Sequence, residues 1–159
     1  LLPLLKPNGR IVILSSISHK WTYKEGIQFN NLDGKKGYSP WLAYGQSKLC
    51  NLLFAKHLAK KIKKNQTSNS LHPGMIATNL NRHLPSYRKF FFKLSENLIL
   101  KSIPQGAATQ SYVLTNPDLD EISGYYFSDC NIKIPSIYGQ NDQLAKKLWQ
   151  ISEKIINSL

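Results

Sequence analysis

The chain has 159 residues, about the length of one domain, and its 42% hydrophobic and 19% charged composition is that of a folded protein. Its apolar runs fall short of the ~20 residues of a membrane-spanning helix. Two cysteines, Cys50 and Cys130, are too few for a disulfide framework and lack zinc-ligand spacing. Composition thus excludes membrane-spanning, fibrous, zinc-finger and disulfide-scaffold proteins. No secretory leader is visible, so we expect a cytoplasmic protein, with peripheral endoplasmic reticulum or mitochondrial association as the alternative.

Basic residues outnumber acidic ones by 21 to 9, which gives a formal net charge of +12. Such an excess favours an anionic partner, for example nucleic acid, a membrane surface or an anionic cofactor. Lysines gather at positions 56, 60, 61, 63 and 64, and most of them share one face of the helix predicted there. We interpret them as a solvated helix face, with a binding patch as the second interpretation, and predict no nucleic-acid partner.

The first predicted elements are a helix end, a buried strand and a long loop. Residues 1–6 are the tail of a helix, which the Pro7-Asn8-Gly9 turn stops. The run from Ile11 to Leu14 is rich in β-branched residues, which is typical of a strand buried on both faces, and two serines follow it. Residues 17–40 contain glycines, a proline and scattered aromatics. A loop of that length inside a domain is usually functional.

The middle of the chain predicts a long helix and a weak strand. Apolar residues at helical spacing indicate an amphipathic helix from about Trp41 to Lys64. A weak strand candidate from Thr67 to Leu71 ends in His72-Pro73-Gly74. The segment that follows, 75–101, is irregular or partly helical and rich in phenylalanine.

The last third of the chain predicts a helix, a strand and a helix. Ser102 caps a helix that runs to about Thr115, residues 124–128 form an aromatic strand, and Asn141 caps the last helix. Parallel strands need helical crossovers between them. The alternation of strands and helices therefore predicts an α/β fold with a parallel sheet.

The candidate chemistry lies at the first strand and the first long helix. Tyr44 and Lys48 are four residues apart, so their side chains share one helix face, where an ammonium group favours the phenolate form of a neighbouring phenol. Tyr44 is therefore a candidate proton donor or acceptor. Ser16 follows the carboxyl end of a buried strand, where open α/β sheets bind ligands, and its hydroxyl could hydrogen-bond a substrate carbonyl. By itself, a tyrosine and a lysine at this spacing is a weak signal, more typical of a surface pair on a helix.

Three stretches together have the order and spacing of the short-chain dehydrogenase/reductase family, which the chain resembles over nearly its whole length. They are Gly9 to Ser16, Tyr44-Gly45-Gln46-Ser47-Lys48, and His72-Pro73-Gly74. Within that family, the chain is most similar to the retinol dehydrogenase branch, which includes the WW domain-containing oxidoreductase. Stretches such as Ser18-His19, Gln105-Gly106-Ala107-Ala108-Thr109 and Gly124-Tyr125-Tyr126-Phe127-Ser128 carry this narrower resemblance.

The resemblance implies a role for each matching residue. Tyr44 would be the catalytic acid/base and would also contact the cofactor. Lys48 would hydrogen-bond the nicotinamide ribose and lower the pKa of Tyr44. Ser16 would polarise the substrate carbonyl and is favoured over Ser15 for that role. The main chain at Pro73-Gly74 would run alongside the nicotinamide ring, and Thr78 would contact the carboxamide or the phosphates of the cofactor. NADP is the expected cofactor, with NAD as the alternative.

A Gly-rich phosphate-binding turn is missing from the pattern, because no G-x-G-x-x-G or similar spacing occurs among the nine glycines. The resemblance then implies that residues 1–159 are the C-terminal half of one domain, namely the last three strands of a Rossmann-type doubly wound parallel sheet and their helices. The N-terminal half of the same domain would be its partner. Without that half, the strand from Ile11 to Leu14 would have an open edge.

Two functions remain after these observations. The first is an oxidoreductase that acts on a lipophilic alcohol, ketone or aldehyde, such as a retinoid or steroid. The second is a non-catalytic interaction protein, or an inactive truncated form. The four histidines share no ligand spacing, so no metal site is predicted. The aromatic and basic segment 87–100 could line a substrate pocket, contact a membrane surface peripherally, or simply pack.

Overall fold

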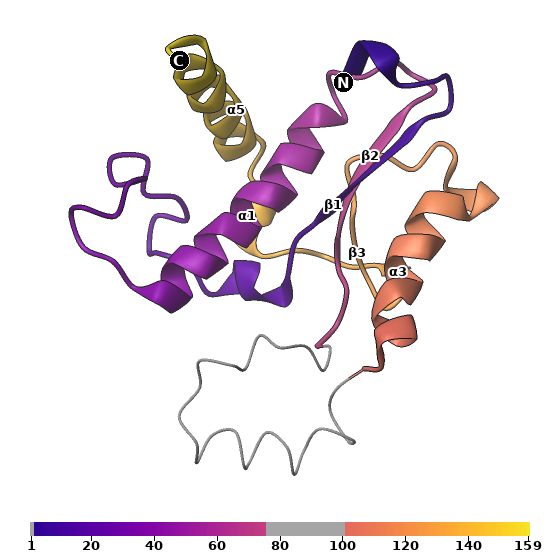
Figure 1. Cartoon of the computed structure of the whole chain (residues 1–159), viewed down its shortest axis with the longest axis horizontal. Helices are drawn as coiled ribbons and strands as arrows, with labels where there is room; N and C mark the ends of the chain where they lie inside the picture. The colour runs from indigo at the N-terminus through magenta and orange to yellow at the C-terminus, as the bar shows by residue number, and fades with distance from the viewer. Residues whose placement is uncertain (1, 76–100) are drawn as a thin grey trace.

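The computed structural model describes residues 2–75 and 101–159 (Figure 1). Thr78 and the segment 87–100 lie outside the described residues, so the roles predicted for them stay predictions. The described helices and strands alternate along the chain, with 3-10 turns between them. They are β1 (Arg10–Leu14), the 3-10 helix η2 (Ile17–Lys20), α1 (Pro40–Leu58), β2 (Thr67–His72), α3 (Ile103–Thr115), β3 (Tyr126–Ser128), β4 (Asn131–Ile132), α4 (Ile137–Gln140) and α5 (Asp142–Asn157).

The strands form a sheet in the order β1-β2-β3-β4. β1 pairs with β2 and β2 with β3 in parallel, so Leu14 lies opposite Leu71, and His72 lies opposite Ser128. α1 and α3 lie on opposite sides of the sheet (Figure 1). The predicted α/β class with three parallel strands is confirmed. The short antiparallel β4, which pairs with β3, was not part of the prediction.

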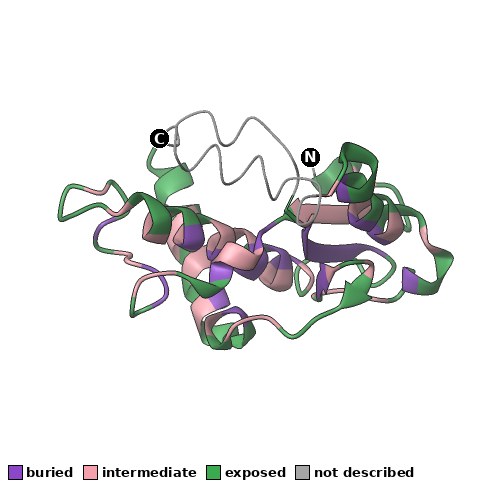
Figure 2. Ribbon diagram, turned by 90° about the horizontal axis from the view of Figure 1, so that it is seen from below, coloured by how far each residue is buried: buried purple, intermediate pink, exposed green. Residues whose placement is uncertain are grey.

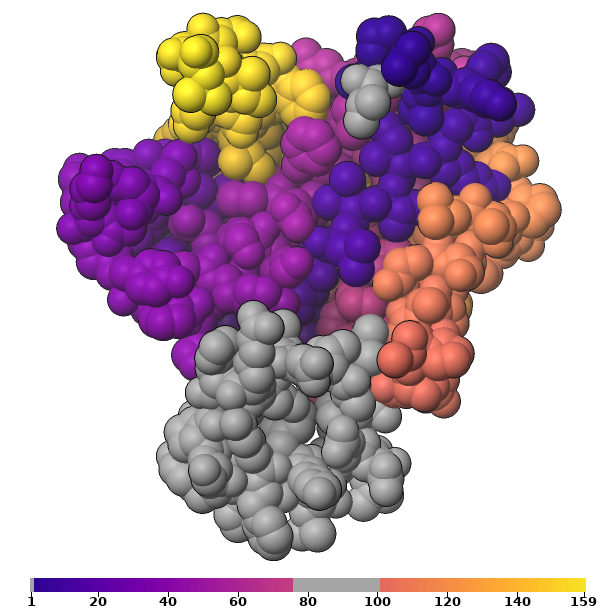
Figure 3. Space-filling model, in the orientation of Figure 1, coloured from indigo at the N-terminus to yellow at the C-terminus, as the bar shows by residue number. Residues whose placement is uncertain are grey.

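β1 is the outermost strand of the sheet in the described part of the chain. Figure 3 shows this indigo segment at the surface between α1 and α3. Its side chains from Arg10 to Ile13 are half-buried, and Leu14 is 47% exposed. The expectation of a strand buried on both faces is therefore wrong for this structure, because one edge of β1 has no neighbouring strand among the described residues.

β2 is the central strand, and it is buried along its whole length although most of its side chains are polar. The polar groups in its middle are paired with neighbouring elements: Ser68 Oγ donates to the Ala55 carbonyl of α1 at 3.0 Å, and Asn69 Nδ2 donates to the Ile122 carbonyl at 2.6 Å. Asn69 Oδ1 also accepts a hydrogen bond from the Tyr125 amide at 2.9 Å. Buried polar groups are costly unless they are paired, and tertiary contacts provide the partners of Ser68 and Asn69.

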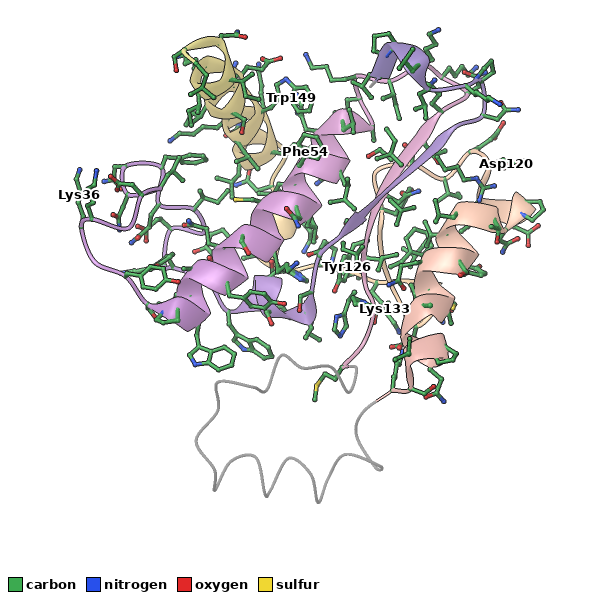
Figure 4. All side chains as sticks on the ribbon, viewed as in Figure 1. Lys36, Phe54, Asp120, Tyr126, Lys133 and Trp149 are labelled. Atoms are coloured by element: carbon green, nitrogen blue, oxygen red, sulfur yellow. The ribbon has the colours of Figure 1, made fainter. Side chains whose placement is uncertain are left out.

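Two apolar cores pack against the sheet. Figure 2 shows buried residues on the strands and on the neighbouring helices. One lies between α1, α5 and Tyr126 of β3, and the other between α3, Leu71 and Phe127. At the outer side of the first core, Phe54 of α1 stacks on Trp149 of α5 with 5.4 Å between ring centroids (Figure 4). α1 is thus fixed on both of its sides, by the sheet and by α5.

α1 ends at Leu58, earlier than the predicted end at Lys64. The lysines beyond it therefore do not extend the face of this helix. Lys56 in the last turn of α1 and Lys60 just after the helix bind the carboxylate of Asp142 in the first turn of α5, at 2.8 and 2.7 Å. These two hydrogen bonds lower the pKa of Asp142 to about 2. Across residues 2–75 and 101–159, no helix has the length and apolar character needed to cross a membrane.

Candidate active site

The predicted site residues within the described ranges lie on elements that end at one edge of the sheet. Ser16 follows β1, and Pro73 and Gly74 follow β2, which runs parallel to β1. Tyr44 and Lys48 lie one turn apart near the start of α1. Parallel strands bring their carboxyl ends together, and open α/β sheets bind ligands at that edge.

Two hydrogen bonds attach α1 to the end of β1. The Ser15 hydroxyl donates to the main-chain carbonyl of Lys48 at 2.7 Å, and Asn51 Nδ2 donates to the carbonyl of Leu14 at 2.8 Å. These bonds join residues that are 33 and 37 positions apart in the sequence. They hold the helix turn that carries Tyr44 and Lys48 against the end of the strand that leads into Ser16.

Gly45 allows α1 to approach the segment after Ser16. A Cβ atom at this position would lie 1.8 Å from the carbonyl oxygen of Trp21 and 2.8 Å from that of Ser18. Both contacts are far shorter than any real Cβ contact, so only glycine is compatible with this packing. A glycine inside a helix is the one sequence signal that could have revealed this close approach.

The hydroxyl of Ser16 is oriented by its neighbour Ser18. Ser16 is the N-cap of η2, and its buried hydroxyl oxygen accepts a hydrogen bond from the Ser18 amide at 3.2 Å. The Ser16 hydroxyl also lies 3.2 Å from Ser18 Oγ, to which it donates. The hydroxyl of Ser15, in contrast, is used to bind α1. The preference for Ser16 over Ser15 as the residue that contacts a substrate stays a prediction.

Tyr44 and Lys48 are close neighbours on the surface of α1. Tyr44 is 36% exposed, and Lys48 Nζ lies 5.6 Å from the centroid of its ring. The arrangement places a cation beside an accessible phenol, as the spacing of four residues predicts.

The turn after β2 has a conformation that favours glycine. Gly74 has φ of +94°, and a Cβ atom there would lie 2.6 Å from the side chain of Lys101. Lys101 forms an ion pair with Asp129, which lowers the pKa of that carboxyl, and its amide donates to the Met75 carbonyl at 2.7 Å. Just before this turn, His72 Nδ1 is buried and has no hydrogen-bond partner in the described part of the chain.

His19 is a buried residue to which the sequence analysis gave no role. Its Nδ1 lies 2.6 Å from the carbonyl oxygen of Ser16, and its Nε2 lies 3.0 Å from the amide nitrogen of Ser136. Its ring meets that of Tyr126 edge to face, with centroids 4.9 Å apart. Burial lowers the pKa of His19 below its ordinary value. Spacing along the sequence could not reveal the contact with Ser136, because 117 positions separate the two residues.

Comparison with curated proteins finds several related dehydrogenases. The chain is 47% identical over 154 residues to the short-chain dehydrogenase TIC 32 A, chloroplastic, of Brassica napus, which covers 95% of this chain and 48% of that protein. It is 37% identical to human retinol dehydrogenase 14, covering 100% of this chain and 48% of the relative. It is 39% identical to the WW domain-containing oxidoreductase of Gallus gallus, covering 93% of this chain and 37% of the relative.

The chain thus spans about half the length, or less, of these relatives. Among solved structures, an uncharacterized protein from Mycobacterium paratuberculosis matches with a TM-score of 0.65 and 25% identity, over 91% of this chain and 49% of that one. No family model matches the sequence. The relatives, the parallel α/β sheet and the motifs at its edge agree with one another, and the chain belongs to the short-chain dehydrogenase/reductase family.

Proposed function

We propose that this chain carries the catalytic groups of an oxidoreductase that uses NADP, with NAD as the alternative, and acts on a lipophilic alcohol, ketone or aldehyde. Tyr44 is the acid/base in this proposal, Ser16 binds the substrate oxygen, and Lys48 assists Tyr44 and contacts the cofactor. The partner required for activity is the other half of the domain, since the sequence has no Gly-rich turn for the cofactor phosphates.

The attachment of α1 to the end of β1 is the observation that carries the proposal. The bonds from Ser15 to Lys48 and from Asn51 to Leu14, together with the close contact at Gly45, fix the start of α1 beside the segment that begins at Ser16. A phenol, an ammonium group and a hydroxyl are thereby supplied from elements that meet at one edge of the sheet. Groups fixed in this way can act on one substrate oxygen without a large loss of entropy.

The residues at this edge fit the nicotinamide end of a dinucleotide. Gly74 has a backbone conformation that other residues rarely adopt and is half-buried beside the Lys101 side chain, and His72 Nδ1 is a buried polar atom without a partner in the described residues. Lys48, Pro73 and Gly74 would hold the nicotinamide and its ribose, as would Thr78, which lies outside the described residues. When bound, this cofactor supplies or accepts a hydride.

In this proposal, side chains of the protein bind the substrate oxygen and transfer the proton. The Ser16 hydroxyl, which donates to Ser18 Oγ in this structure, would turn to donate its hydrogen bond to the carbonyl oxygen of the substrate and so stabilise the negative charge that develops there. Tyr44 gives its phenolic proton to that oxygen during reduction and takes the proton back from the alcohol during oxidation. The ammonium group of Lys48 lies beside this ring, with Nζ 5.6 Å from the ring centroid.

The proposed substrate class rests on two observations. Four of the relatives are named retinol dehydrogenases, and the segment 87–100 contains three consecutive phenylalanines among basic residues. Retinoids and steroids have the apolar character that such a segment would accommodate. A cytoplasmic location and a peripheral membrane contact remain predictions from the sequence.

Replacement of Tyr44 by phenylalanine tests this function in the full-length natural protein, with NADPH and retinaldehyde as probes. We expect Tyr44→Phe to lower kcat by about 100-fold or more, because the transferable proton is lost, while NADPH binding persists. Lys48→Ala should weaken NADPH binding and also lower kcat, since this side chain serves both. A Tyr44→Phe variant that keeps more than about a tenth of the wild-type kcat would exclude the proposed acid/base.

A further inference from the structure

We propose that His19 is a positioning residue that fixes the main chain of Ser16 and so aims its hydroxyl at the substrate, an inference that rests on the function proposed above. The role is carried by geometry: His19 is completely buried and bridges the Ser16 carbonyl and the Ser136 amide. Because it acts through Ser16, His19 itself need not contact the substrate.

The two neighbours of the imidazole determine where its proton lies. A main-chain amide can only donate, so Nε2 must accept the hydrogen bond from Ser136 and carries no proton. A carbonyl oxygen can only accept, so Nδ1 carries the proton and donates it to Ser16. The ring is thus a neutral imidazole with a single tautomer. If the proton were on Nε2 instead, both hydrogen bonds of the buried ring would be lost, and the Ser136 amide and the Ser16 carbonyl would lose this partner.

Two hydrogen bonds converge on the Ser16 carbonyl oxygen. The His19 amide donates to it at 3.1 Å and the His19 side chain at 2.6 Å. Together they fix the peptide plane after Ser16, and that plane sets the direction in which the serine side chain leaves the main chain. The hydrogen bond from the Ser18 amide to Ser16 Oγ, at 3.2 Å, depends on the same turn.

The other side of the imidazole is held by a rigid part of the fold. Ser136 is the N-cap of α4, and its hydroxyl accepts a hydrogen bond from the Gly139 amide at 3.3 Å. The end of α4 is bound to α1, because Lys56 Nζ donates to the Gln140 carbonyl at 2.6 Å. His19 therefore connects the turn at Ser16 to a segment fixed on the same helix that carries Tyr44 and Lys48.

Two substitutions separate the two hydrogen bonds of His19. Asparagine places an amide near the position of Nδ1 and can still donate to the Ser16 carbonyl, whereas glutamine places its amide near Nε2 and can serve only Ser136. Both substitutions remove the edge-to-face contact with Tyr126, so a difference between the two variants cannot come from loss of that contact.

In the full-length protein with NADPH and retinaldehyde, we expect His19→Asn to keep kcat within about threefold of the wild-type value. His19→Gln should lower kcat by about tenfold or more, with KM and NADPH affinity unchanged, because a small misplacement of a catalytic group is that costly.

A double-mutant cycle with Ser16→Ala separates failure of this inference from failure of the proposed function. If His19 acts through Ser16, His19→Gln lowers kcat no further in the Ser16→Ala background. Additive losses, or equal kcat values for the Asn and Gln variants, would overturn the role of His19 while leaving Ser16 catalytic. Full activity of Ser16→Ala itself would instead refute the proposed function.

The tautomer gives a second readout that needs no variant at position 19. Nitrogen NMR of the wild-type protein at neutral pH should find His19 protonated at Nδ1 and unprotonated at Nε2. The opposite tautomer, or exchange between the two, would overturn the inference even if both variants failed to fold.

Discussion

The hydroxyl of Ser15 donates a hydrogen bond to the main-chain carbonyl of Lys48, with 2.7 Å between the two oxygens. Because of this bond, the two adjacent serines have different roles. Ser15 holds the helix that carries the proposed acid/base, whereas the Ser16 hydroxyl contacts only its own turn, through Ser18. Neighbouring residues of the same type can thus serve different purposes, because successive side chains point in different directions from an extended main chain.

Ser15→Ala should therefore lower mainly the stability, whereas Ser16→Ala should lower mainly the activity. Ser15→Ala removes one largely buried hydrogen bond and should lower the free energy of unfolding by about 1 kcal/mol, with less than a tenfold loss of kcat. Ser16→Ala should lower kcat by about 100-fold, a typical loss for one donor to a developing oxyanion, with a smaller change in stability. Urea unfolding and steady-state kinetics of the full-length variants measure both quantities. A larger kcat loss for Ser15→Ala would reverse the assignment.

Gly45→Ala should destabilise the protein strongly, because the added methyl group would lie 1.8 Å from the carbonyl oxygen of Trp21. Overpacking of this kind costs about 1–3 kcal/mol, although alanine is the better helix former at an unconstrained position. Ser47→Ala, on an exposed position of the same helix, is the control and should change the free energy of unfolding by less than about 0.5 kcal/mol. Equal stability of Gly45→Ala and wild type would mean that α1 does not approach the segment after Ser16 this closely.

The 159 residues by themselves should not bind NADPH with a dissociation constant below about 1 mM. In the proposed function they would contact the nicotinamide end only, whereas the pyrophosphate would need a Gly-rich turn and a helix N-terminus. Titration with NADPH, followed by fluorescence of Trp21, Trp41 and Trp149, measures this affinity. The exposed edge of β1 should also make the isolated chain prone to aggregation. Saturable micromolar binding by a soluble monomer would contradict both expectations.

His19 should make stability sensitive to mild acid. Its pKa is lowered from 6.5, mainly by burial and also by the charge of Lys20, so the unfolded chain takes up a proton at a higher pH than the folded one. Stability is thus complete above about pH 6.5 and is lost as the pH falls from there toward the lower folded pKa. His19→Gln should show a smaller drop in urea midpoint between pH 7.5 and 5.5 than wild type.

The Tyr44→Phe protein is the control for this pH series, because its histidines are unchanged. It should lose as much stability as wild type over the same interval. The pKa values of His72 and His57 are also lowered, mainly by burial, and both residues are present in all three proteins. An equal drop in His19→Gln and wild type would show that His19 does not cause the acid sensitivity.

The sequence by itself predicted the α/β class, the three parallel strands and the family. These follow from local patterns, such as the aliphatic run from Ile11 to Leu14, the capping serine at 102 and the motif from Tyr44 to Lys48. The capping box between Ser102 and Gln105 and the cap of α5 by Asn141 form as their residue types predict. Local preferences are reliable there because the interacting groups lie within a few residues of each other.

Only the tertiary structure decided what the buried polar residues do. β2 looks like a weak strand from its sequence, yet it is the central strand, because α1 and the segment before β3 supply partners for Ser68 and Asn69. Likewise, the partner of Ser15 is 33 positions away and that of His19 is 117 positions away. Hydrogen bonds between such distant residues leave no periodic trace in a sequence, so their pairing is fixed only when the sheet and its helices come together.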